Sequence, residues 1–316
     1  MQLQTKVEKV DFKNKIDYKS TIFMIGSCFS ANIGEKLIVR RFNTLYNPLG
    51  TLYNPQSVVD TLTILKEKRL ITTDDLFFHR ELYGSFIANT LLTSSRAAEA
   101  VEMINSAIIR GEKQLRESDF IIITLGTSLC YYQKESGKAV ANCHKFPAAD
   151  FERKLIDSDE TYELFASLFK QEYFKDKHII FTVSPVRYIK DGFAVNSVSK
   201  AHLLVAVDNL CKKFENVDYY PSYEIFNDEL RDYRFYDSDM VHPSKIGVDY
   251  VWERFSTEVI DVDSQRYMKE VESVVKALAH RPQNPQSAAH QKFLSTTFQK
   301  AQQLEKEIGI VLNYKL

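Results

Sequence analysis

The 316-residue sequence has almost no net charge and no long apolar run. Its 41 basic and 42 acidic residues give a formal net charge of -1. No strong electrostatic field is therefore available to attract nucleic acid or an anionic membrane surface, and we expect neither as a partner. No apolar segment approaches the roughly 18 residues of a membrane-spanning helix, and the first residues lack the apolar core of a secretory signal.

Cysteine is scarce as well. The four cysteines are Cys28, Cys130, Cys143 and Cys211, and no two of them form a Cys-x-x-Cys pair. This spacing favours free thiols over a disulfide framework or a zinc site, and we expect a cytoplasmic protein. The sequence does contain 44% hydrophobic and 12% aromatic residues, which is typical of an ordered globular protein.

Short apolar runs that end at turn residues predict buried strands. They cover residues 21–25, 118–125 and 178–183, and a shorter strand is expected at 217–220. Segments with apolar residues at helical spacing separate these runs. The alternation predicts a three-layer α/β/α domain with a mainly parallel, doubly wound sheet.

The segments around these strands are less regular. Residues 1–20 are polar and are expected to lie over the surface, and two Asn-Pro steps predict a turn-rich loop over 42–55. Residues 131–140 are interpreted as a β-hairpin. Asn196 or Ser197 is expected to cap the helix that follows the third strand.

The composition changes after residue 261. Apolar residues at helical spacing extend from 271 to 278, and a polar helix is predicted over 288–308. We therefore predict an α/β domain at 1–261 and a C-terminal helical extension at 262–316. The extension would pack on the core or on a second subunit, which makes it a candidate homodimer interface.

Ser27 directly follows Gly26 at the end of the first predicted strand and comes before a helix predicted over residues 30–40. Parallel sheets bind their ligands at the carboxyl ends of the strands, so a serine here is a candidate nucleophile. Serine is also a common helix-capping residue. The residues alone leave both interpretations open.

His242 offers a base for Ser27. Asp239 comes three residues earlier, close enough to bind one ring nitrogen and fix the tautomer, although the same segment could be only a capping turn. Acyl transfer also needs N–H donors for the oxyanion. Candidates are the N–H of Ser27 or Cys28 at a helix start, and that of Gly50, because glycine lets the backbone approach a substrate closely.

Residues 142–145, Asn-Cys-His-Lys, bring four reactive residue types together. Cys143 beside His144 suggests a thiol nucleophile, but adjacent residues of a strand point to opposite faces. Cys28 is better interpreted as a small buried hydrophobic residue. Thiol chemistry is therefore an alternative to serine chemistry.

The segment 26–30, Gly-Ser-Cys-Phe-Ser, closely resembles the signature of the GSCFA-domain family, which ends in alanine where this chain has Ser30. Further matching stretches, in family order, are Asn47-Pro48-x-Gly50 with Tyr53-Asn54-Pro55, Leu125-Gly126-Thr127, Asn142-Cys143-His144-Lys145, Ser184-Pro185-Val186-Arg187, Asn196 with Ser199-Lys200-Ala201, and Asp239-x-x-His242-Pro243. Together they extend from residue 21 to about 260.

That family looks related to the SGNH (GDSL-like) hydrolases. The resemblance implies a flavodoxin-like fold and esterase or acyl hydrolase activity, with no metal and no cofactor. It implies Ser27 as the nucleophile, Asp239 and His242 as its partners, and the N–H of Gly50 as an oxyanion donor.

One block of that superfamily, Gly-x-Asn-Asp, is replaced here by Gly-Thr-Ser-Leu at 126–129. The expected substitute for the missing asparagine is Asn142 or, as a poorer donor, Ser128, and Arg187, Lys145 and His144 are expected to bind the substrate. The resulting hypothesis is a serine esterase that removes a small acyl group, such as acetyl, from an alcohol or carbohydrate. The alternatives are a non-catalytic module that binds a glycan or nucleotide, and a Cys-dependent acyl transferase.

Overall fold

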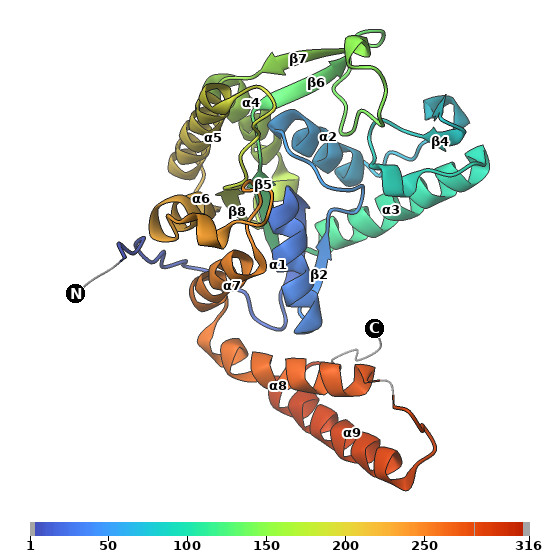
Figure 1. Cartoon of the computed structure of the whole chain (residues 1–316), viewed down its shortest axis with the longest axis vertical. Helices are drawn as coiled ribbons and strands as arrows, with labels where there is room; N and C mark the ends of the chain where they lie inside the picture. The colour runs from blue at the N-terminus through green and yellow to red at the C-terminus, as the bar shows by residue number, and fades with distance from the viewer. Residues whose placement is uncertain (1–3, 281, 312–316) are drawn as a thin grey trace.

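A five-stranded parallel sheet lies at the centre of the computed structural model, which describes residues 4–280 and 282–311 (Figure 1). Its strands are β1 (Thr21–Gly26), β2 (Asn43–Tyr46), β5 (Phe120–Leu125), β8 (His178–Val183) and β9 (Val217–Tyr219). They lie in the order β2-β1-β5-β8-β9. This order, 2-1-3-4-5 along the chain, is that of flavodoxin-like doubly wound sheets, and the predicted parallel sheet is confirmed.

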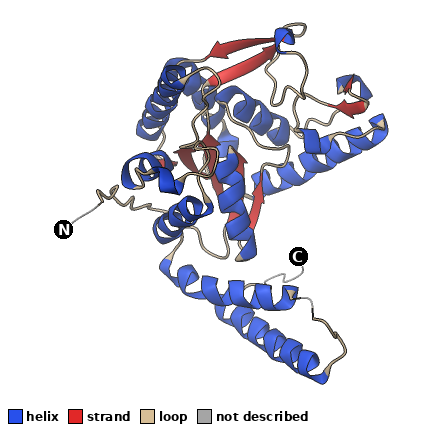
Figure 2. Ribbon diagram, in the orientation of Figure 1, coloured by secondary structure: helices blue, strands red, loops and turns tan. Residues whose placement is uncertain are grey.

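Helices cover both faces of the sheet and complete the three layers (Figure 2). One face packs against α2 (Pro55–Lys66), α3 (Ala97–Glu117), α4 (Ser158–Phe169) and α5 (Phe193–Lys213), and the other against α1 (Cys28–Val39), α7 (Lys245–Val259) and the turn formed by α6 (Ser222–Glu224) and a π-helical segment (Ile225–Glu229). In β5, Ile121 and Ile123 face the first layer and Ile122 the second, which is why this strand is apolar throughout.

Two strands correct the sequence interpretation. Residues 43–46, predicted as part of a loop, form the edge strand β2, which pairs in parallel with β1. The hairpin predicted over 131–140 is present, because the Val140 N–H donates to the Tyr131 carbonyl and the Gln133 N–H to the Lys138 carbonyl, each at 2.9 Å. The longer partner of β6 (Leu129–Gln133) is β7 (Phe151–Leu155), an antiparallel strand that was not predicted. Residues 134–138 form the polar turn of the 131–140 hairpin, which the antiparallel Tyr132–Ala139 bridge closes, whereas β7 brings the buried Phe151.

Two further elements differ from the prediction. One is a hairpin that the sequence did not indicate, and the other is a helix that begins earlier than expected. Residues 77–84 form a hairpin of β3 (Phe77–His79) and β4 (Leu82–Gly84). Helix α5 begins at Phe193, ahead of the predicted caps. Asn196 lies inside the helix, and its Oδ1 accepts the Tyr188 N–H at 2.8 Å, which closes the loop that follows β8.

The N-terminal arm, residues 4–20, is more than the surface segment expected from its polar composition. Its apolar side chains Phe12, Ile16 and Tyr18 are buried in the second layer. Ile16 also forms a parallel bridge with Ile260 at the end of α7. Residues 1–3 lie outside the described part of the chain.

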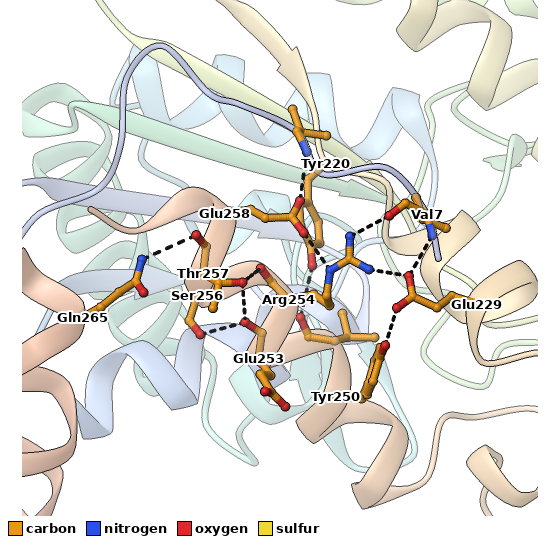
Figure 3. Close-up of polar contacts among 12 residues, drawn as sticks. Val7, Tyr220, Glu229, Tyr250, Glu253, Arg254, Ser256, Thr257, Glu258 and Gln265 are labelled. Carbon is orange, nitrogen blue, oxygen red and sulfur yellow. Dashed lines mark hydrogen bonds and ion pairs between the residues drawn. The ribbon is translucent and has the colours of Figure 1, made fainter. Parts of the chain in front are cut away.

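A buried ionic cluster fastens this arm (Figure 3). Arg254 of α7 forms ion pairs with Glu229 and Glu258, whose side chains are 0% and 2% exposed. The same two carboxylates accept the backbone N–H of Val7 at 3.0 Å and of Val10 at 3.2 Å. The Arg254 cluster therefore joins the start of the chain to α7 and the π-helical turn.

The C-terminal helices α8 (Val262–Ala279) and α9 (Ala288–Ile308) form a pair beside the sheet domain (Figure 1). Val271 of α8 is buried in the second layer and Glu272 forms an ion pair with Arg40 of α1, while α9 packs on α8. The predicted boundary at 261 lies directly before α8, residues 312–316 of the predicted extension lie outside the described residues, and the homodimer stays a prediction. None of the described helices has the length and apolar character needed to cross a bilayer.

Candidate active site

A cavity of about 420 Å³ opens at the carboxyl ends of β1, β5 and β8. Its lining includes Ser27, Cys28, Tyr53, Asn54, Gly126, Thr127, Leu129, Tyr131, Val140, Ala141, Asn142, Cys143, Ser184, Val186, Arg187, Tyr188, Val241 and His242. Doubly wound sheets bind ligands at this edge, and the volume suits a small molecule.

Ser27 is held at the cavity by the way β1 ends. Gly26 has φ +132°, and a Cβ there would lie 2.1 Å from the Thr124 carbonyl oxygen, so only glycine lets β1 end so close to β5. Ser27 then begins α1, but its side chain makes no capping hydrogen bond. It is 1% exposed, and its Oγ has no hydrogen-bond partner among the described residues. A buried hydroxyl without a partner costs stability and needs a reason other than capping.

Asp239 and His242 form a hydrogen-bonded pair on the cavity rim. Asp239 Oδ2 lies 2.6 Å from His242 Nδ1, and Oδ1 accepts the backbone N–H groups of His242 and Val241. These bonds lower the pKa of Asp239 to about 2, and the largest contribution comes from the His242 backbone N–H. With Nδ1 bound to a carboxylate, Nε2 is left as the proton acceptor of the neutral ring.

The structure brings Ser27 and His242 into the same cavity without joining them. No hydrogen bond is made by Ser27 Oγ, so the His242–Ser27 contact stays a prediction. The side chains of His242 and Asp239 are 51% and 50% exposed, in contrast to the buried serine. The base therefore lies on an exposed loop and the candidate nucleophile on the rigid end of a strand.

Two of the expected oxyanion donors have other partners. The Ser27 N–H donates to the Thr124 carbonyl at 3.0 Å, and the Gly50 N–H donates to the Asn47 carbonyl at 2.9 Å. Gly50 is also absent from the residues that line the cavity. Its φ of +108° and its close packing on Asn89 account for a glycine there.

Two side-chain amides do line the cavity. Asn142 Oδ1 accepts the His144 N–H at 2.8 Å, which leaves its Nδ2 as the donor end. Asn54, which was not predicted as a site residue, caps α2 by accepting the Ser57 N–H at 2.8 Å. Its Nδ2 is likewise the free end of the amide. In the sequence, Asn54 belongs to a predicted turn-rich loop and to a stretch that matches the family signature, and the match was the one available signal for this second role.

Arg187 is the one expected substrate-binding residue in the cavity lining. Its guanidinium lies over the Tyr236 ring at 4.9 Å and its Nη2 donates to the Met240 carbonyl, within the loop that carries Asp239 and His242. Among the described residues it forms no ion pair with a carboxylate, so its charge is available to a ligand.

His144 and Lys145 lie outside this lining. His144 is buried, and its Nε2 must carry a hydrogen because both of its partners are carbonyl oxygens, those of Ala88 at 2.8 Å and Ser85 at 3.1 Å. Burial also lowers the pKa of His144. Lys145 is exposed to solvent. His144 thus ties the 142–146 loop to the loop after β4 and does not face the cavity.

Two thiols, Cys28 and Cys143, line the cavity. Burial raises the pKa of both, which favours the protonated thiol over the reactive thiolate. The ring of His144 is occupied by carbonyl oxygens, so it does not activate Cys143. Across the described residues, no three His, Cys, Asp or Glu side chains are grouped so as to hold a metal ion.

The sheet order and the buried serine at a strand end define a doubly wound α/β protein with its ligand cavity at the usual edge. Comparison with family models matches residues 21–255 to the GSCFA family and residues 271–310 to the C-terminal domain of GSCFA domain proteins. The chain belongs to the GSCFA family. A comparison with curated proteins gives no match.

Proposed function

We propose that this protein is a serine-dependent acyl hydrolase of the SGNH (GDSL-like) type. It would remove a small acyl group, such as acetyl, from an alcohol or carbohydrate. The observation that carries the proposal is the buried Ser27 hydroxyl, which has no hydrogen-bond partner among the described residues and lies in the same cavity as His242. The hydrogen bond from His242 to Asp239 supports a role for the imidazole as a base.

In the proposed reaction, His242 Nε2 takes the proton of Ser27 as Oγ attacks the ester carbonyl carbon. The exposed loop has to bring Nε2 within roughly 2.6–3.2 Å of Oγ when substrate binds. The Oγ–C bond forms, the ester C–O bond breaks, and the alcohol leaves with the proton from His242. Water, deprotonated by His242, then attacks the acyl carbon, the acyl–Oγ bond breaks, and His242 returns the proton to Ser27 Oγ as the carboxylic acid leaves. The ionised Asp239 balances the imidazolium in both steps.

The oxyanion would be bound by the amides of Asn142 and Asn54. Both line the cavity with their Oδ1 atoms already bound elsewhere, so each amide presents Nδ2. The N–H of Cys28, in the first turn of α1, is a third candidate. Each such donor is worth about 3 kcal/mol of transition-state stabilisation.

Arg187 is proposed to orient a polar or anionic part of the substrate, since its guanidinium reaches the cavity without a carboxylate partner among the described residues. The four cysteines are free thiols. This supports our proposal that the protein works in a reducing compartment such as the cytoplasm.

A fluorophosphonate label tests the nucleophile, with hydrolysis of p-nitrophenyl acetate as a second readout. We expect one labelled serine, and Ser27→Ala to abolish both labelling and turnover. Ser128→Ala is the matched control, because Ser128 is also buried with an unpartnered hydroxyl but lies outside the cavity lining. Labelling that persists in Ser27→Ala would overturn the assignment.

A non-catalytic module that binds a glycan or nucleotide is the second candidate. It is favoured by the missing Ser27–His242 hydrogen bond and by the engaged N–H groups of Ser27 and Gly50. This candidate predicts that a ligand binds without being turned over and that Ser27→Ala binds it as well as the parent protein. Isothermal titration with acetylated and free sugars and with nucleotides separates the two.

A further inference from the structure

Lys200 of α5 is buried directly behind the cavity. Its side chain is 1% exposed, and Nζ donates to the carbonyl oxygens of Gly126 and Ser184. These residues immediately follow β5 and β8, and both line the cavity. The ammonium group therefore lies behind the two strand ends that form the wall next to Ser27.

The neighbouring Ser199 reinforces the same wall. Its Oγ accepts the Ser128 N–H at 2.7 Å and shares a hydrogen bond with Thr127 Oγ1 at 3.0 Å. Ser199 and Lys200 thus hold the loop after β5 together, and Lys200 also joins it to the loop after β8, next to the Ser184 N–H, which donates to the Leu125 carbonyl at 2.8 Å. An uncharged amide or hydroxyl could also donate to these carbonyl oxygens, and burying a charge is far costlier than burying either group. The two hydrogen bonds alone therefore do not explain a charged group at this position.

No carboxylate compensates this charge within the described residues. Lys200 forms no ion pair, and burial alone lowers its pKa to about 7, with no charged side chain acting on it. The groups that face it from the ends of β5 and β8 are the carbonyls of Gly126 and Ser184. Perturbed, uncompensated groups of this kind are concentrated at functional sites.

We propose that Lys200 is a positioning residue of the Ser27 site, whose ammonium ties the ends of β5 and β8 together and places a positive charge behind the anion formed on Ser27. This inference rests on the proposed acyl hydrolase function. During attack by Ser27 a negative charge develops on the acyl oxygen. A cation in a water-poor surrounding stabilises that charge more strongly than a cation in bulk water does.

The rate at which a fluorophosphonate reacts with Ser27 tests the proposal. In this reaction the Oγ–P bond forms, the P–F bond breaks, fluoride leaves, and the serine proton passes to His242. The rate is measured from pH 6 to pH 9 for the wild type, Lys200→Met and Lys200→Gln. The ratio of wild-type to variant rate cancels the pH effects of all groups that the three proteins share.

We expect the wild type to react about tenfold faster than either variant at pH 6. The ratio should fall as the pH rises through neutral, because a deprotonated Lys200 resembles the uncharged glutamine. Lys177→Met is the matched control. Lys177 is also buried and donates to two carbonyls, those of Arg116 and Ser118, but it lies at the opposite ends of β5 and β8. It should keep the wild-type rate and pH profile.

The outcomes separate the two proposals. If the protein is labelled but the ratio of wild-type to variant rate is one at every pH, the role of Lys200 is overturned and the hydrolase function is not. If the ratio is above one but does not change with pH, the role of the Lys200 charge is overturned. A wild-type protein that is not labelled at Ser27 overturns the hydrolase function, and the inference falls with it. Lys200→Gln keeps a donor for the carbonyls, so the test stands if Lys200→Met does not fold.

Discussion

Two cations of this protein, one fully and one largely buried, have opposite surroundings. Arg254 lies between Glu229 and Glu258 and fastens the N-terminal arm (Figure 3), whereas Lys200 meets only the carbonyl oxygens of Gly126 and Ser184. Burial acts to lower the pKa of both, but for Arg254 the two glutamates outweigh it and raise the pKa. The first cation holds parts of the chain together. The second, in our proposal, is tolerated by the fold because the site uses it.

The largest effect on stability is expected from breaking the compensated cluster. Arg254→Met leaves Glu229 and Glu258 buried without their cation, which should lower the free energy of unfolding by about 3–5 kcal/mol. Urea denaturation measures the change. Arg266→Met is the control, since it removes an exposed ion pair with Asp263 and should cost less than about 1 kcal/mol. Equal losses of unfolding free energy in Arg254→Met and Arg266→Met would show that the Arg254 cluster stabilises the fold no more than an exposed ion pair does.

The uncompensated cation should give a stability that depends on pH. Below pH 7 Lys200 is protonated in both states, and the folded state bears the full cost of burying the charge. Between the folded pKa of about 7 and the ordinary value of 10.5, the unfolded chain binds more protons, so wild-type stability rises with pH. The stability of Lys200→Met relative to wild type should therefore fall from pH 7 to pH 10, by at most about 1.4 kcal/mol per pH unit.

Urea denaturation of both proteins at pH 6, 8 and 10 measures this difference. Lys177→Met again serves as a comparison, because Asp176 and Asp119 offset part of the burial effect on the Lys177 pKa. The pH dependence should be smaller for this variant than for Lys200→Met. A difference between Lys200→Met and wild type that is the same at all three pH values would contradict the buried charge.

The exposed Asp239–His242 pair extends the comparison, because it should matter to the rate and hardly to stability. Asp239→Asn should slow fluorophosphonate labelling about 100-fold and leave the urea midpoint unchanged, since both side chains are half exposed. With its pKa at about 2, Asp239 stays ionised above about pH 4, so the deficit should persist across that range. Asp237→Asn in the same loop is the control. Equal labelling rates in Asp237→Asn and Asp239→Asn would exclude a role of the Asp239–His242 pair in the reaction.

The smallest effect is expected from the cavity thiols. Cys143→Ala should change the labelling rate by less than about twofold, because burial raises the pKa of this thiol and keeps it protonated near neutral pH. Iodoacetamide treatment before labelling gives a second measure. A strong loss of turnover by either route would instead favour the Cys-dependent acyl transferase.

The parallel sheet was predictable because its central strands are buried on both faces and read as unbroken apolar runs, as residues 21–25 and 178–183 do. The edge strand β2 and the outlying β7 were missed because they are short and partly polar, so their pairing is decided by tertiary neighbours. The place of Ser27 at the cavity was predictable because a glycine and a helix start mark the end of its strand.

Lys200 and Asn54 show what the sequence could not indicate. Lys200 lies three and seven residues before Leu203 and Val207, on the buried side of α5, a position that a helical pattern assigns to apolar residues. A lysine there was detectable as an exception, but its partners, the carbonyls of Gly126 and Ser184, were not. Likewise the Asn54-Pro55 step predicted only a turn, whereas the place of Asn54 in the cavity depends on how the loop after β2 folds back over β5, where Gly126 and Thr127 donate to the Tyr53 carbonyl.

The Arg254 cluster also has a consequence for the order in which the protein can fold during synthesis. Val10 hydrogen-bonds Glu258, which lies 248 residues further along the chain. At about 5–20 residues per second the ribosome needs roughly ten to fifty seconds to make that stretch. The N-terminal arm emerges first and must wait, undocked, until α7 has left the ribosome. Its apolar residues Phe12, Ile16 and Tyr18 are therefore a natural place for a chaperone to bind the nascent chain.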